Sequence, residues 1–113
     1  MQINQEENTV VFSWEKTDPK GVDFKNKIKG HYKNLADQNV AIDLSNFPKL
    51  KSSDILNFKE LSDYHRQETN KSFVFVVGNF SIDNLPDEIS IAPTLNEALD
   101  IIDMEEIERD LGL

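Results

Sequence analysis

The side chains best suited to binding chemistry lie in one segment of the chain. Asp43 and Ser45 close an apolar run, and Ser52 and Ser53 follow after a polar loop. The apolar run predicts a strand, and the residues that follow the serines predict a helix. A strand that delivers hydroxyl groups to a helix N-terminus makes a place for a phosphate or for an acidic group of a partner.

Two interpretations of the serine pair follow from the residues alone. A serine at a helix N-cap accepts a hydrogen bond from a free backbone N–H, which contributes about 1 kcal/mol and explains the residue without any partner. A phosphorylated serine would instead carry about −1.5 to −2 charges near the positive end of the helix dipole. Lys49 and Lys51 would help to hold that charge, whereas Asp54 would oppose it. Both interpretations stay open at this point.

Catalysis is the alternative from another class of protein. His31 and His65 lack the close helical spacing of a metal-binding pair, so packing or surface roles explain them better. Asp43 ends a strand, where α/β enzymes place functional groups, but capping of the adjacent loop backbone is the simpler role. The sequence has no phosphate loop, dinucleotide-binding glycine turn or nucleophile elbow. We therefore expect no enzyme, no metal site and no cofactor, and an enzyme using Asp43 is the less favoured alternative.

Apolar patterns predict the elements that must position these groups. Runs of β-branched and aromatic residues predict strands at 2–4, 10–14, 40–44, 72–77 (expected to be central) and 89–92 (expected at an edge). The polar stretch 78–88 is too irregular for a helix. Strands that alternate with helices predict an α/β fold with a mixed, largely parallel sheet of four to five strands packed with helices, in one domain spanning 1–113.

Three helices are predicted from apolar residues at helical spacing. The first follows one stripe through Phe24, Ile28, Tyr32 and Leu35. The second covers about 53–68, with an inner face made of Ile55, Phe58, Leu61, Tyr64 and His65. The last begins at a capping box and is expected to be interrupted at 103–106, with these residues facing inward: Leu95, Ala98, Leu99, Ile102 and Ile107.

Composition limits the class of protein. The 113 residues carry a net charge of −9, and 87–113 hold nine acids against the single base Arg109. Such a chain should repel nucleic acid. There is no cysteine, which excludes disulfides and thiol catalysis, and no apolar run long enough to cross a membrane. The polar start of the chain is not a signal peptide, so we expect a cytoplasmic protein.

The order Asp43-Leu44-Ser45, then Ser52-Ser53 at the start of a helix, resembles the STAS domain, the fold of bacterial anti-sigma factor antagonists and of sulfate-transporter tails. The register places Ser52 and Ser53 on the serine pair that carries the phosphoacceptor in that family. The segment 91–99, with its proline-threonine pair, resembles the last strand and helix of the family. The resemblance covers most of the chain.

Three departures from the family pattern concern the same region. Lys51 stands where the family usually has aspartate, and Asp54 stands where it usually has glycine, which bears on recognition by a kinase. The span 78–88 is shorter than the family's usual helix between its last two strands, which would expose sheet or alter the partner face.

The resemblance implies a non-enzymatic protein-interaction module that acts on transcription through a protein partner, such as an anti-sigma factor kinase. Phosphorylation at Ser52 or Ser53 would release the partner, because a new dianion repels acidic groups and must be desolvated. The alternative within the same fold is a module without a switch, which binds through the same surface or serves in a larger complex. The expected partner-binding surface comprises Asp43, Ser45, Lys49, Lys51, Asp54 and Asn57.

Overall fold

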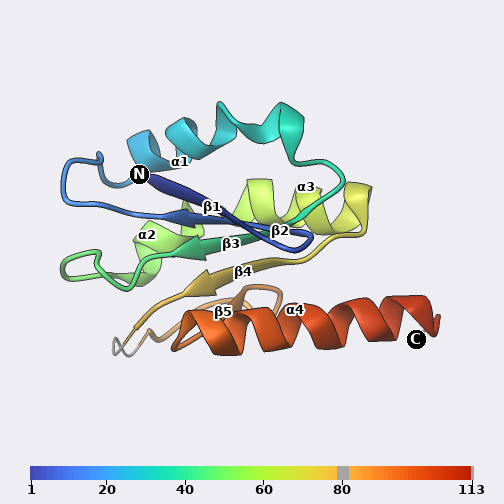
Figure 1. Cartoon of the computed structure of the whole chain (residues 1–113). Coiled ribbons are helices and arrows are strands. Elements are labelled where there is room, and N and C mark those ends of the chain that lie inside the picture. The colour runs from blue at the N-terminus through green and yellow to red at the C-terminus, as the bar shows by residue number, and fades with distance from the viewer. Residues whose placement is uncertain (79–81, 113) are drawn as a thin grey trace.

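A five-stranded sheet forms the centre of the fold in the computed structural model, which describes residues 1–78 and 82–112. The strands lie in the order of the chain: β1 (Gln2–Glu6), β2 (Thr9–Ser13), β3 (Asn39–Asp43), β4 (Phe73–Val76) and β5 (Ser90–Ala92). β1 pairs antiparallel with β2, and every other neighbouring pair is parallel. The predicted α/β fold with a mixed, largely parallel sheet is confirmed, with β4 inside the sheet and β5 at its edge (Figure 1).

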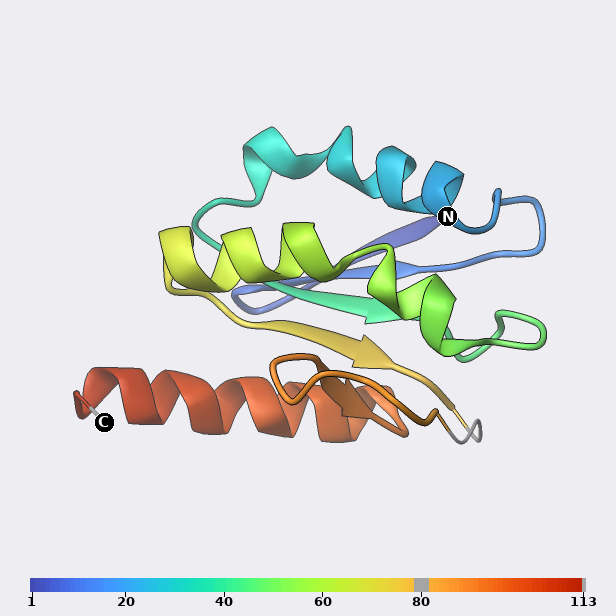
Figure 2. The same cartoon turned by 180° about the vertical axis from the view of Figure 1, so that it is seen from behind.

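Helices cover both faces of the sheet, but unequally. Three helices lie on one face, namely α1 (Val22–Lys29), α2 (Ser52–Leu56) and α3 (Lys59–Thr69), while α4 (Leu95–Asp110) lies on the other (Figures 1 and 2). The connections from β2 to β3 and from β3 to β4 step across the sheet in the same direction. Since parallel crossovers are right-handed, both connections place their helices on the same face.

Alternation along the strands gives the two faces different cores. Phe12, Ile42 and Phe75 point toward α1, α2 and α3 in a large cluster that also contains Trp14. The side chains between them on the strands are smaller and form a second cluster with α4: Val11, Ala41, Val74, Val76 and Ala92, packed by Ala98 and Ile102. The small side chains let α4 approach the sheet closely, whereas aromatic residues fill the opposite layer.

The first two predicted helices differ from those observed. α1 ends at Lys29 with Gly30 as its C-cap, and Tyr32 belongs to a separate 3-10 turn, Tyr32–Asn34, because glycine weakens the continuing helix. The second predicted helix, at about 53–68, is not continuous, so that prediction is wrong. A tightened turn, in which the Phe58 N–H donates to the Ile55 carbonyl at 2.9 Å, separates α2 from α3.

The inner face of α3 is also narrower than predicted. Leu61 and His65, four residues apart, point into the core. Tyr64 lies to the side of that stripe and is 53% exposed, so its predicted inward position is wrong. His65 is completely buried, which agrees with the packing role predicted for it.

α4 is one continuous helix, so the predicted interruption at 103–106 is wrong. Its start is as predicted, because the Thr94 hydroxyl accepts a hydrogen bond from the Glu97 N–H at 3.2 Å. Ile107 is 58% exposed, so its predicted inward position is also wrong, since Glu106 and Arg109 occupy the side of the helix that meets the sheet. In the described part of the chain, no helix is long and apolar enough to cross a membrane.

The connection between β4 and β5 covers the sheet without a helix of its own in the part that the structure describes. Ile82 and Leu85 are partly buried against the large cluster, and Ile89 belongs to it. The expectation that a short connection would expose the sheet is therefore wrong for 82–89. The predicted irregular stretch includes residues 79–81, which lie outside the described residues.

His65 links α3 to the segment between α1 and β3. Its Nε2 lies 2.8 Å from the Gln38 carbonyl oxygen and its Nδ1 lies 2.8 Å from the Tyr32 hydroxyl. A carbonyl oxygen only accepts, so Nε2 carries the proton and Nδ1 accepts from Tyr32. Burial lowers the pKa of His65 from its ordinary 6.5, and the hydrogen bond to Gln38 opposes that shift only in part.

The stability of the fold should therefore depend on pH through His65. Below pH 6.5 the unfolded chain takes up a proton that the folded chain excludes, so the free energy of unfolding falls as the pH is lowered. The slope approaches about 1.4 kcal/mol per pH unit. Urea unfolding of wild type and His65→Gln between about pH 5 and 7 measures it, and the variant should show a flatter pH dependence. The control His31→Gln, which removes an exposed histidine, should keep the wild-type slope, and an equal slope in His65→Gln would contradict this assignment.

Candidate functional site

Three apolar anchors fix the loop that follows β3. Leu44, Phe47 and Leu50 are each buried in the large cluster, at a regular spacing of three residues. The ring of Phe47 packs on that of Trp14 with 5.0 Å between the ring centroids. The side chains between the anchors point outward, so the following residues are exposed at the carboxyl edge of the parallel strands: Ser45, Asn46, Pro48, Lys49 and Lys51.

Asp43 organises the first turn of this loop. Its Oδ1 accepts hydrogen bonds from the Ser45 N–H at 3.0 Å and from the Ser45 hydroxyl at 2.6 Å. This is the local backbone capping that the sequence predicted for Asp43. Gly78, two residues after β4, lies against this turn. Its φ is 64°, a left-handed backbone conformation that favours glycine, and a Cβ there would lie 3.3 Å from the Ser45 Cα. Both the conformation and the close approach therefore require the absence of a side chain at this position.

α2 begins at Ser52, but neither serine caps it. Lys51 occupies the N-cap position, and its ammonium group is a donor that accepts nothing. The Asp54 carboxylate accepts a hydrogen bond from the Lys51 N–H at 2.9 Å, and the Asp54 N–H donates to the Lys51 carbonyl at 3.0 Å. The interpretation of Ser52 or Ser53 as the N-cap is therefore wrong. Lys51 occupies the N-cap position, and the Asp54 carboxylate at the third helical position supplies the side-chain acceptor at the start of the helix.

The two serines differ in their access to solvent. Ser52, the first residue of α2, is half-buried, whereas Ser53 is exposed. Neither hydroxyl makes a hydrogen bond with another residue in the described part of the chain. Ser53 is the more accessible of the two.

The cations of the loop are also free to meet a partner. Lys49 sits at the tip of the loop with a φ of 51°, the left-handed region that a lysine rarely adopts. Within 1–78 and 82–112, neither Lys49 nor Lys51 forms an ion pair. The carboxylates of Asp43 and Asp54 each accept a backbone N–H of the loop, so this edge presents both lysine and aspartate side chains.

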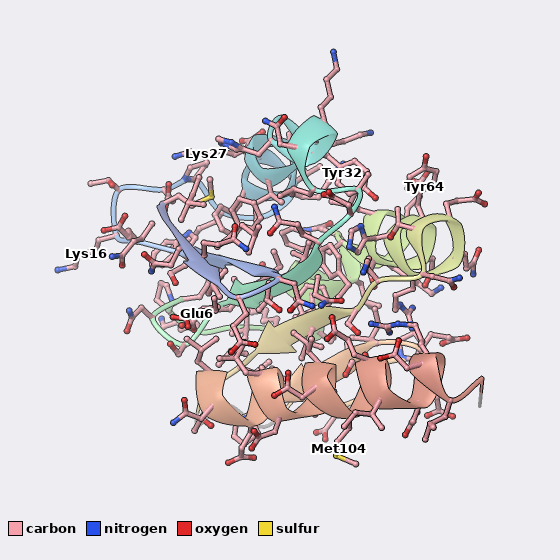
Figure 3. All side chains as sticks on the ribbon, turned by 45° about the vertical axis from the view of Figure 1, so that its right-hand side comes forward. Glu6, Lys16, Lys27, Tyr32, Tyr64 and Met104 are labelled. Atoms are coloured by element: carbon pink, nitrogen blue, oxygen red, sulfur yellow. The ribbon has the colours of Figure 1, made fainter. Side chains whose placement is uncertain are left out.

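Asn57, the last of the predicted partner-binding residues, faces a different part of the surface. It is half-buried at the end of α2 and lines a cavity of about 350 Å³ between α1 and α3, together with Lys25 and Tyr64. The edge-to-face pair of Tyr32 and Tyr64, with 5.9 Å between ring centroids, forms part of its wall (Figure 3). The structure thus places the predicted loop residues together at the carboxyl edge of the sheet. Asn57 is not part of that group, because it lines the cavity between α1 and α3.

The sequence-based interpretation missed the residues that hold the loop in place. Phe47, Leu50 and Gly78 were not among the predicted site residues, yet they determine where Ser45 and the lysines point. A signal for the anchors was present, since apolar residues recur every third position from Leu44 to Leu50. No comparable local signal marks Gly78, whose role depends on contact with a segment far away in the chain.

A scan against models of known protein families found no match, and a search of curated proteins found no relative. Among the described residues, no group of three or more histidine, aspartate or glutamate side chains is placed to hold a metal ion.

The Asp54 cap gives a test of how the loop is held. Asp54→Ala should lower the free energy of unfolding by about 1 kcal/mol, because the Lys51 N–H loses its hydrogen-bond acceptor. Amide hydrogen exchange should accelerate most in α2, whose five residues have little stability of their own. Asp54→Asn keeps a side-chain oxygen and should retain most of the protection. Unchanged exchange in α2 of Asp54→Ala would show that the buried anchors alone hold the helix.

Proposed function

We propose that this chain is a cytoplasmic, STAS-like protein-interaction module that resembles the anti-sigma factor antagonists. It binds its partner through the loop after β3 and the start of α2. The observation that supports this most directly is the anchored loop, in which Leu44, Phe47 and Leu50 are buried while polar side chains project at the carboxyl edge of the sheet. A loop held by a rigid scaffold is a common way to present a binding surface.

The partner we propose is an anti-sigma factor kinase that phosphorylates the loop and is thereby released. Ser53 is the favoured phosphoacceptor because it is exposed, and Ser52 is the second candidate because it is half-buried. A phosphate there would add about −1.5 to −2 charges. Lys49 and Lys51 would attract it within the chain, but an acidic surface of the partner would be repelled.

Phosphorylation can be tested by incubating the protein with a candidate anti-sigma factor kinase and ATP, followed by mass spectrometry of the peptides. We expect phosphate on the serine pair, strongly reduced in Ser53→Ala and less so in Ser52→Ala, because the exposed hydroxyl is the easier to reach. Ser45→Ala is the matched control, since Ser45 is an exposed serine in the same loop. Phosphate that persists in a Ser52→Ala, Ser53→Ala double variant would contradict the assignment.

A module without a switch is the second candidate, and one observation favours it. The Asp54 carboxylate already accepts the N–H at the start of α2, so a phosphate on a neighbouring serine would meet a negative charge there. Binding distinguishes the two candidates. Ser52→Asp and Ser53→Asp should each weaken binding of the partner by about tenfold or more if the switch operates. Wild-type affinity in both variants would support constitutive binding instead.

We also propose that Asp43 has no catalytic role. Its Oδ1 accepts two hydrogen bonds from Ser45 and so serves the turn of the loop. A broad substrate screen that detected turnover, abolished by Asp43→Asn, would overturn this.

A further inference from the structure

The outer face of α4 carries an apolar stripe that nothing in the described part of the chain covers. Met104, Ile107 and Leu111 are 61%, 58% and 67% exposed, and their spacing of three and four residues places them on one side of the helix. Figure 3 shows Met104 pointing away from the sheet. An amphipathic helix on a sheet normally has a polar outer face, so an apolar row there departs from the usual pattern.

Polar contacts on the inner side of α4 fix this orientation. The Glu106 Oε1 accepts hydrogen bonds from the side-chain amides of Asn8 and Asn39, each at 2.5 Å. The Arg109 guanidinium donates to the Ser72 hydroxyl at 3.1 Å and to the Asn39 side-chain oxygen at 3.3 Å. Because both side chains are held at the amino edge of the sheet, the helix cannot turn its opposite face inward.

Acidic residues surround the stripe. The exposed side chains beside it on α4 are Asp100, Asp103, Glu108 and Asp110. Arg109 is the only base of α4, and it points toward the sheet, while Arg66 and Lys71 share a small pocket with Glu105 and Glu108 on one side of the helix. The stripe is therefore apolar at its centre and carries exposed acids beside it, namely Asp100, Asp103 and Asp110, while Glu108 lies on the side of the cations of the small pocket.

We propose that the outer face of α4 is a docking surface for a cationic amphipathic helix of a partner protein. Leucine-like side chains of that helix would cover Met104, Ile107 and Leu111, and its lysines or arginines would face the flanking carboxylates. A second copy of this chain fits poorly, because pairing two such faces would bring acids against acids. An anionic membrane is disfavoured for the same reason. This surface is distinct from the loop after β3 and does not depend on the function proposed for that loop.

The probe for this proposal is a fluorescein-labelled peptide of about 18 leucines and lysines, with leucines at the spacing of one helical face. Its binding to the full chain is measured by fluorescence anisotropy. Ile107→Glu should weaken binding about tenfold or more, because it places a charge in the middle of the apolar contact. Val22→Glu is the matched control, since Val22 is 52% exposed at the start of α1 and its substitution changes the net charge equally. The control should bind like wild type.

Further arms separate the apolar contact from simple charge attraction. Asp103→Asn and Glu108→Gln together should weaken binding and make it less sensitive to salt. A peptide of the same composition with scrambled order should bind much more weakly. Equal losses in Ile107→Glu and Val22→Glu, or equally tight binding of the scrambled peptide, would overturn the proposal. A dimer seen by sedimentation and abolished by Ile107→Glu would overturn it in favour of a second copy.

Discussion

The parallel pairing of β3 with both of its neighbours is the constraint on which the rest of the structure depends. β3 pairs with β2 from Thr9 opposite Asn39 onward, and with β4 on its other side. Hydrogen bonds extend this pairing past the strand, from the Trp14 N–H to the Asp43 carbonyl at 3.0 Å and from the Leu44 N–H to the Val76 carbonyl at 2.9 Å. The chain therefore leaves the sheet at a fixed place and in a fixed direction, which makes it possible for the loop that follows to be anchored by so few residues.

The same strand also separates two unlike halves of the molecule. On one face its Ile42 meets aromatic side chains under three helices, and on the other its Ala41 lets α4 come close. The smaller core beneath α4 offers less apolar area to hold that helix. Asn39, which is completely buried at the start of β3, makes the polar contacts with Glu106 and Arg109 that hold the C-terminal half of α4. One strand thus positions the loop at its carboxyl end and the long helix at its amino end.

Features that depend on local pattern could be predicted from the sequence, and features that depend on distant contacts could not. The strands were predictable because their β-branched and aromatic runs are a local signal, and so was the start of α2 at the serine pair. The direction of Ile107 was not, because it depends on the contact of Glu106 with Asn39, which is 67 residues away. The capping of α2 was also misassigned. A serine and an aspartate both suit a helix start, and only the backbone geometry decides which of them receives the N–H.

The loop after β3 and the outer stripe of α4 lie at opposite edges and on opposite faces of the sheet (Figures 1 and 2). The stripe is near the amino edge, because Arg109 contacts Asn39 and Ser72, whereas the loop leaves the carboxyl edge. A strand of five residues spans about 16 Å, and charges are screened over about 8 Å at physiological ionic strength. A phosphate on Ser53 would therefore act on whatever binds the loop and leave a partner on α4 in place. Under the two proposals, the protein would connect two partners and release only one of them.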